Sequence, residues 1–343
     1  MGLISRINPT CKITGGEKTA ATINARLIGV EVVDAAGIES DSVRIDIDAH
    51  DLAVWPEEGQ RLGVLLGYVD TGLRDLGEFK LTRIAESLLP NTITLTGTAA
   101  PFEAADPTEF KKRRSATYEA TTVGAVVQAI AKRHGFTPRI HPDFAELALA
   151  HWDQNNETDI RFLSRLARAY DAVCKPTNGL LIFSRRGQVK SLSGRTIEPV
   201  VVRYPGDRAA DDADFTNANV VSGGKKKAKG VSAFWYDDAA GESVEVVLGD
   251  EPRKRLRTKF KDATEAKNHA EAELRKMARE GDKLSLDCPG DPLLAAESPL
   301  QLVGFPSKRM SADWSADRVT HSYRRGQGYR CKVEATVPGV QAV

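Results

Sequence analysis

The stretch QNNETDIRFLSRLARAY, from Gln154 to Tyr170, predicts a helix of about four turns. Its start carries three candidate N-caps, Asn155, Asn156 and Thr158, and negative charge beside the first turn from Glu157 and Asp159. Apolar side chains then recur at helical spacing, at Ile160, Leu163, Leu166, Ala167 and Tyr170. Largely on the other side lie Arg161, Arg165 and Arg168. The pattern is typical of a core helix with one buried stripe and one basic face.

Length and charge narrow the class of protein. A chain of 343 residues suggests two or three domains with ample material for packed cores. It holds 48 Lys and Arg against 47 Asp and Glu, for a net charge of +1, whereas a dedicated nucleic-acid binder usually shows a strong basic excess. The 28% charged and 41% hydrophobic fractions are typical of a soluble globular protein.

The cysteines and the N-terminus indicate synthesis in the cytoplasm. The four cysteines lie far apart and form no C-x-x-C pair, which favours reduced, buried thiols; they are Cys11, Cys174, Cys288 and Cys331. The opening MGLISRINPTCK lacks the apolar length of a signal peptide, and no run approaches the roughly 18 apolar residues of a membrane span.

Residues 1–100 predict antiparallel strands. In Ser42–Asp48, Val43, Ile45 and Ile47 alternate with polar residues, and Asn91–Thr98 repeats that period of two. Further strands are expected at Leu27–Val33, Arg61–Val69 and Glu78–Ile84. Short strands joined by Gly, Asp, Pro and Asn turns favour a small barrel or sandwich.

Residues 101–120 interrupt the strand pattern. The proline-bearing PFEAADPTEF precedes a charge run of Lys111, Lys112, Arg113 and Arg114. A solvated linker is the ordinary interpretation of such a run. The alternative is a basic contact, either with a neighbouring subunit or with DNA passing through a pore.

Residues 121–187 predict an α+β segment. A helix capped by Thr121 or Thr122 should end near His134, with Gly135 as a left-handed stop. The stretch Gln154–Tyr170 follows, and then two apolar runs around Asn178-Gly179, a strong hairpin signal.

Residues 189–343 return to strands. The expected strands are Thr196–Arg203, Val231–Tyr236, Ser243–Leu248, Lys283–Cys288, Leu300–Gly304, Val319–Tyr323 and Tyr329–Val337. Two insertions interrupt them: an acidic, then lysine-rich loop at 204–230, and a helix at 262–280 with a capping box formed by Asp262 and Glu265.

Two strings resemble the phage late control gene D family, the hub proteins of contractile phage tails. The pattern Q-x-N-E-[ST]-D-x-x-F-L-x-R-L-A is matched by Gln154, Asn156, Glu157, Thr158, Asp159, Phe162, Leu163, Arg165, Leu166 and Ala167. The pattern T-[LV]-G-x-[IV]-V-x-x-I-A-x-R-H-G is matched by Thr122, Val123, Gly124, Val126, Val127, Ile130, Ala131, Arg133, His134 and Gly135. The VgrG proteins of type VI secretion carry a looser version of the first. Nearer the C-terminus, Trp314, Val319 and His321 match the family more loosely.

The resemblance implies a mainly β architecture with an α+β insert. It predicts a tube-facing barrel at 1–100, a middle domain at 101–188, and a second barrel at 189–343 that carries the loop and helix insertions. Three such chains would form a trimeric ring that adapts a sixfold tail tube to a threefold central spike. The implied partners are a second and third copy, the tube protein, the spike and the tape-measure protein, with DNA passing through the lumen. The implied location is the tail baseplate of a virion or tailocin.

The chemistry of a catalytic or metal site is not evident in the sequence. None of the six histidines has H-E-x-x-H or similar metal spacing, no G-x-S-x-G occurs, and no cofactor is implied. The signature residues are structural, and no catalytic residue is carried over from the family. Two rival functions remain: a tail-tip cell-wall hydrolase, which would need a catalytic Glu or Cys in a deep cleft, and a DNA-binding regulator, which would need a basic excess or a helix-turn-helix.

Overall fold

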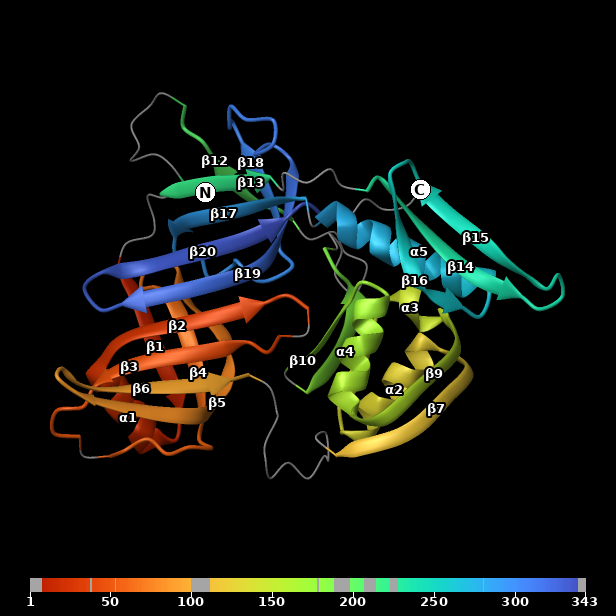
Figure 1. The fold of residues 1–343 in the computed structure, drawn as a ribbon. Helices are drawn as coiled ribbons and strands as arrows, with labels where there is room; N and C mark the ends of the chain where they lie inside the picture. The colour runs from red at the N-terminus through yellow and green to blue at the C-terminus, as the bar shows by residue number, and fades with distance from the viewer. Residues whose placement is uncertain are drawn as a thin grey trace. The chain divides into compact units, whose positions relative to one another are not determined.

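The computed structural model describes residues 8–37, 39–52, 54–99, 112–177, 179–187, 198–206, 214–222, 228–279 and 281–338. Strands dominate, and the chain divides into two compact units (Figure 1). The first unit comprises Met1–Glu103, Glu198–Val220 and Leu284–Ala335. The second comprises Ala104–Ile197, Val221–Lys283 and Thr336–Val343. This grouping does not follow the three expected ranges, because the segment with the 262–280 helix packs with the middle of the chain.

The first unit is built on a 12-stranded sheet whose main path runs β1-β4-β5-β6-β3-β2-β19-β20-β17-β13, with β12 and β18 attached beside β19. Its N-terminal elements are β1 (Pro9–Gly15), α1 (Glu17–Arg26), β2 (Leu27–Ala35), β3 (Ser42–Asp48), β4 (Arg61–Tyr68), β5 (Gly72–Leu88) and β6 (Asn91–Thr98). Its C-terminal strands are β12 (Val200–Arg203), β13 (Asn217–Ser222), β17 (Asp282–Pro289), β18 (Pro299–Val303), β19 (Asp313–Arg324) and β20 (Gly328–Thr336).

The two β regions are joined by backbone hydrogen bonds. β2 pairs antiparallel with β19, from Arg318 opposite Ala35 to Arg324 opposite Gly29. The expectation of two separate barrels is therefore corrected: no closed barrel is found among the described residues, and the strands of both regions continue one sheet. The sequence could not reveal this, because strand alternation identifies a buried face but not the neighbouring strand.

Alternation in β3 and β6 builds the core of the N-terminal half. Val43, Ile45 and Ile47 point inward and meet Ile93 and Leu95 of β6, which lies antiparallel beside β3. Helix α1 adds a side chain that also closes the sheet edge: Asn24 Oδ1 accepts from Ile13 N at 2.8 Å, and Asn24 Nδ2 donates to Ile13 O at 2.7 Å. The carboxamide thus takes the place of a neighbouring strand beside β1.

The second unit contains the α+β segment and a small sheet. The α+β segment consists of β7 (Arg113–Thr122), α2 (Val123–Arg133), β8 (Thr137–Ile140), α3 (Pro142–Ala145), β9 (Ala148–Thr158), α4 (Asp159–Ala169), β10 (Ala172–Thr177) and β11 (Leu180–Arg185). The small sheet consists of β14 (Gly230–Asp237), β15 (Glu242–Gly249) and β16 (Arg253–Phe260), and α5 (Ala263–Arg279) packs on one of its faces.

Several local expectations are confirmed and others are corrected. The strands at 42–48 and 91–98, helices α2 and α5, and the β10–β11 hairpin form as predicted. The helix at 154–170 is shorter, because residues 154–158 end β9 and the helix begins at Asp159. Part of the expected linker at 101–120 is strand β7, and part of the expected loop at 204–230 is strand β13. Polar composition concealed both strands, and also β1 and β16.

Candidate functional site: the polar cluster at the start of α4

The family-like residues converge on one buried carboxylate. Thr158 caps α4, its Oγ1 accepting from Arg161 N at 3.4 Å. The next residue, Asp159, is fully buried. Its Oδ2 lies 2.8 Å from Arg133 Nη1, 2.7 Å from His134 Nε2 and 3.4 Å from Arg114 Nε. One side chain therefore ties α4 to both α2 and β7.

The partners of Asp159 favour its ionised form. Burial alone would raise the pKa of the carboxyl. Hydrogen bonds from Gln154, His134 and Arg133, together with the positive charge of Arg133, outweigh that effect and hold the pKa of Asp159 below its usual range. The same contact raises the pKa of Arg133 against the opposing effect of desolvation. Asp159 is thus ionised at neutral pH and pairs with Arg133 as a carboxylate.

Three polar residues of the stretch before α4 have specific structural roles. Gln154 donates from Nε2 to Asp159 Oδ1 at 2.8 Å and to Glu157 O at 3.0 Å, so it fixes the bend between β9 and α4. Asn156 has a φ of 45°, a left-handed conformation that asparagine adopts more readily than most residues. Glu157, in the last residues of β9, forms an ion pair with Arg165 of α4. The expectation that Glu157 faces the helix N-terminus is thereby refined, because its carboxylate bonds an arginine.

The apolar signature residues form the core beneath this cluster. Leu163 and Leu166 are fully buried, as is Phe162, which stacks on Tyr118 of β7 with ring centroids 5.1 Å apart. The Arg165 guanidinium lies 4.9 Å from the centre of the Trp152 ring. All three arginines of α4 are exposed, but Arg165 also packs its guanidinium against an aromatic ring.

The second family-like string explains how α2 is placed. Thr122 caps the helix, accepting from Ala125 N at 3.1 Å. A Cβ on Gly124 would lie 2.4 Å from Ala145 O, so only glycine permits this approach of α2 to α3. The helix ends at Arg133, and Gly135 follows the C-cap His134 with a φ of +73°, its amide donating to Lys132 O at 3.2 Å. These glycines position His134 and Arg133 against Asp159.

A second group of contacts, on α5, was not foreseen from the sequence. Arg279 in its last turn forms a buried bidentate ion pair with Asp171, which follows α4. His269 of α5 stacks between three rings, with centroid distances of 4.7 Å to Phe260, 5.0 Å to Tyr170 and 6.4 Å to Trp152. Burial lowers the pKa of His269 to about 4. The sequence gives no sign of these contacts, because Trp152 and Tyr170 lie far from His269 in the chain.

The residues of the charge run 111–114 do not share one environment. Lys111 lies outside the described residues, and Lys112 is exposed. Arg113 opens β7 and donates to Asn156 O at 3.5 Å, and Arg114 reaches Asp159. The expected solvated linker is therefore wrong for Arg114, which belongs to the buried network.

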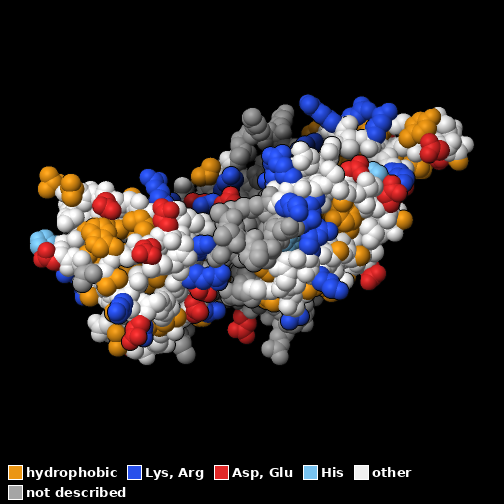
Figure 2. Space-filling model, turned by 90° about the horizontal axis from the view of Figure 1, so that it is seen from below, with side chains coloured by type: hydrophobic (Ala, Val, Ile, Leu, Met, Phe, Trp, Pro, Cys, Tyr) orange, Lys and Arg blue, Asp and Glu red, His pale blue; other side chains and the backbone are white. Residues whose placement is uncertain are grey.

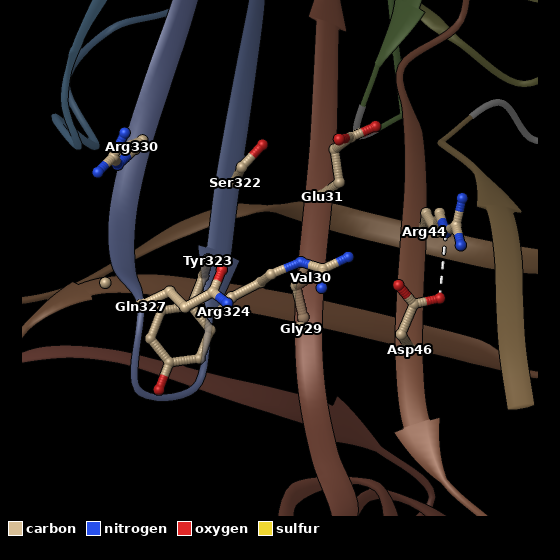
Figure 3. Close-up of a pocket in the computed structure, with 11 residues that line it drawn as sticks. Gly29, Val30, Glu31, Arg44, Asp46, Ser322, Tyr323, Arg324, Gln327 and Arg330 are labelled. Atoms are coloured by element: carbon tan, nitrogen blue, oxygen red, sulfur yellow. Dashed lines mark hydrogen bonds and ion pairs between the residues drawn. The ribbon is translucent and has the colours of Figure 1, made fainter. Parts of the chain in front are cut away.

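A shallow pocket of about 590 Å³ lies on the first unit, on the outer face of β3, β2, β19 and β20 (Figure 3). Its acidic lining residues are Glu31 and Asp46. Asp46 is held by Arg44 Nε at 3.1 Å and by Thr94 Oγ1 at 2.7 Å. Gly29 forms the floor, and the Arg324 side chain lies across it. The lining thus carries one ion pair, Arg44–Asp46, together with further charged side chains, which gives it the character of a polar contact face.

The thiols and histidines are placed for packing. Burial raises the pKa of both Cys11 and Cys174 to about 12, which keeps these thiols protonated and weakly nucleophilic. His321 is buried, with Nδ1 2.6 Å from Tyr329 Oη. Among the described residues no cluster of three or more His, Cys, Asp or Glu side chains has metal-binding geometry.

The relatives of this chain are tail proteins. Residues 110–327, more than half of the chain, match the family model described as phage tail baseplate hub (GPD). The probable baseplate hub protein of Escherichia phage P2 is 26% identical over 357 residues, covering 92% of this chain and 89% of the relative. That of Escherichia phage 186 is 26% identical over 333 residues, covering 87% and 85%.

Solved structures share the fold at lower identity. A tail protein from Neisseria meningitidis MC58 superposes with a TM-score of 0.68 at 13% identity, covering 96% of each chain. The 43 kDa tail protein of prophage MuSo2 from Shewanella oneidensis gives 0.67 at 13% identity, covering 96% of this chain and 99% of that one. The type VI secretion component c3393 of E. coli gives 0.56 at 15% identity, covering 97% and 79%. The chain thus belongs to the phage tail baseplate hub family and is a hub protein of a phage tail.

Proposed function

We propose that this hub protein acts as a non-enzymatic homotrimer that adapts a sixfold tail tube to a threefold central spike. The observation that carries the proposal is the pairing of β2 with β19, which holds the two β regions of one chain in a single hydrogen-bonded sheet. A trimer meets six equivalent tube surfaces only if each chain supplies two. Two β regions fixed to each other by a continuous ladder suit that task, because they cannot shift independently under load.

The proposed ring has a lumen through which the tape-measure protein and DNA pass. The chain would be made in the cytoplasm and become part of the baseplate of a virion or tailocin. In the described residues no helix is both long and apolar enough to cross a bilayer. Charged side chains of both signs lie on the face shown in Figure 2, which suits assembly through polar contacts.

The proposal is tested by measuring assembly with the spike protein encoded in the same genome. Light scattering and native mass spectrometry of the full chain, alone and with that spike, should give a complex containing three copies of each. A chain that stays monomeric in both samples would contradict the hub trimer.

A hydrolase role is tested separately with purified peptidoglycan. We expect no cleavage by the full chain under conditions in which a lysozyme control is active. Cleavage that disappears in Glu31→Gln or Asp46→Asn would instead identify the shallow pocket of the first unit as an active site and reverse the non-enzymatic assignment.

A further inference from the structure

The small sheet of the second unit has two open edges with opposite charge. Its strand order is β15-β14-β16, so within the described parts of the chain β15 and β16 each have only one neighbouring strand (Figure 1). Helix α5 covers one face, where Val231, Ala233 and Phe260 pack against Ala266 and Ala270. The edges carry backbone groups free for contact, and their side chains determine which partner is accepted.

The β15 edge is acidic. Between residues 237 and 251 the chain has no Lys, Arg or His, and its six carboxylates are Asp237, Asp238, Glu242, Glu245, Asp250 and Glu251. On the strand itself Glu242 and Glu245 are exposed and form no ion pair within the described part of the chain. The strand also lacks the lysine or proline that commonly protects an edge from pairing.

The β16 edge is basic. Residues 252–261 contain no acidic side chain, and their six cations are Arg253, Lys254, Arg255, Arg257, Lys259 and Lys261. Two of them are neutralised locally, by the pairs Arg253–Glu251 and Lys254–Glu273. Arg257 and Lys259 are exposed, and no ion pair joins either to another described residue.

Apart from Arg253–Glu251, where the chain passes from β15 to β16, no ion pair joins the two charge sets among the described residues. β14 separates β15 from β16, which places the edges roughly 10 Å apart, about one Debye length at 0.1 M salt. A second copy removes this separation, because its basic edge can approach the acidic edge of the first directly. Contacts between two acidic or two basic edges would be repulsive, so the favoured arrangement is head to tail.

We propose that the acidic β15 edge of one copy of this chain binds the basic β16 edge of the next copy. The inference rests on the proposed homotrimer and assigns it an interface. A head-to-tail contact is heterologous, and a ring is the closed form of such a contact. β14 runs antiparallel to β15 and parallel to β16, so copies placed side by side meet along antiparallel strands.

One register of the two strands places a charged pair on one face of the extended sheet and an apolar pair on the other. With Glu245 opposite Arg257 of the neighbouring copy, Val246 lies opposite Leu256, and both apolar residues already pack toward α5 in their own chain. The pairing of β16 with β14 has a register shift between Ser232 and Phe234, so β16 is irregular. Side-chain complementarity therefore contributes more to the specificity of the contact than a continuous ladder of backbone hydrogen bonds.

A charge-swap experiment on the full chain tests the interface. The acidic-edge variant is Glu242→Lys with Glu245→Lys, the basic-edge variant is Arg257→Glu with Lys259→Glu, and a third protein carries all four changes. Sedimentation velocity should show self-association weakened about tenfold or more in each double variant and restored in the fourfold variant. Glu57→Lys with Glu58→Lys, on an exposed loop of the first unit, is the matched control and should change nothing.

Cross-linking locates the contact. A Glu245→Cys chain mixed with an Arg257→Cys chain should form an interchain disulfide, whereas Glu245→Cys alone should not. If the wild type forms trimers that survive both charge reversals without this disulfide, the interface is overturned while the hub function stands. If the wild type is monomeric with and without its spike, the proposed trimer itself fails. Association that weakens as NaCl rises and follows the charge-swap pattern supports the interface.

Discussion

The two compact units of this protein are stabilised by different chemistry. The N-terminal half of the first unit has an apolar core, in which residues such as Ile45, Leu62 and Phe79 are fully buried between strands. Among the described residues, every buried carboxylate and guanidinium belongs to the second unit, namely Asp159, Asp171 and Arg279. An apolar core constrains mainly volume, whereas a buried ion network also requires particular partners at particular positions. The two family-like strings lie in the second unit and include Asp159 and its partners Gln154, Arg133 and His134.

The largest expected effect is the loss of the apolar contact beneath the network. Leu163→Asp or Leu166→Asp would bury an unpaired charge and should lower the free energy of unfolding by about 5 kcal/mol, giving insoluble protein. Leu163→Met, which conserves volume, should cost less than about 1.5 kcal/mol and serves as the control. Soluble expression and chemical denaturation measure both. A Leu163→Asp variant that folds normally would mean that this helix face is not buried.

The second prediction concerns the network itself. Asp159→Ala leaves Arg133 without its buried partner and should cost about 4 kcal/mol at pH 7, while Asp153→Ala, at an exposed carboxylate, should have a much smaller effect. Because the folded pKa of Asp159 is lowered, its contribution is present above the unfolded pKa and is lost as pH falls through the folded pKa. Urea titrations should therefore show wild type and Asp159→Ala converging in acid. A constant gap from pH 7 to pH 3 would rule out the ion network as the cause.

The contrast between the units also shows what sequence reasoning could reach. Strands such as β3 and β6 were predictable because alternation records burial on one face. The helix caps at Thr122 and Thr158 and the stop at Gly135 were predictable because they depend on local backbone chemistry. These are properties that a short window of sequence contains.

The rest depends on contacts between distant residues. Nothing around Ala35 or Arg318 indicates that β2 and β19 are neighbours, so two barrels were expected where one sheet continues. β7 and β16 were hidden by their charge, since a strand exposed on one side of a small sheet needs few apolar residues. The ion pair of Asp171 with Arg279 joins residues far apart in sequence, and polarity alone predicts solvent exposure for both.

The third prediction compares a partly buried histidine of the second unit with a buried histidine of the first. Burial lowers the pKa of His269 in the second unit and of His321 in the first to about 4. Each therefore contributes stability above the unfolded value of 6.5 that is lost as pH falls toward 4, up to about 3 kcal/mol per histidine. His269→Phe keeps the ring contacts and should remove the part of the pH dependence of the unfolding free energy that comes from His269. Denaturation between pH 7 and pH 4 measures it, and an unchanged slope would place the His269 imidazole in contact with solvent.

The smallest expected effect separates two arginines of one helix. Arg165 stacks on Trp152 and pairs with Glu157, whereas Arg168 is exposed on the next turn. Arg165→Ala should cost about 1 kcal/mol through lost stacking and pairing, and Arg168→Ala should stay within about 0.5 kcal/mol. Arg165→Lys should recover little, because an ammonium cannot stack its plane on the indole while bonding Glu157 and the Asp153 carbonyl. Equal costs for Arg165→Ala and Arg168→Ala would mean that the basic face of α4 is uniformly solvated, and that Arg165 belongs to the signature for a reason outside the fold.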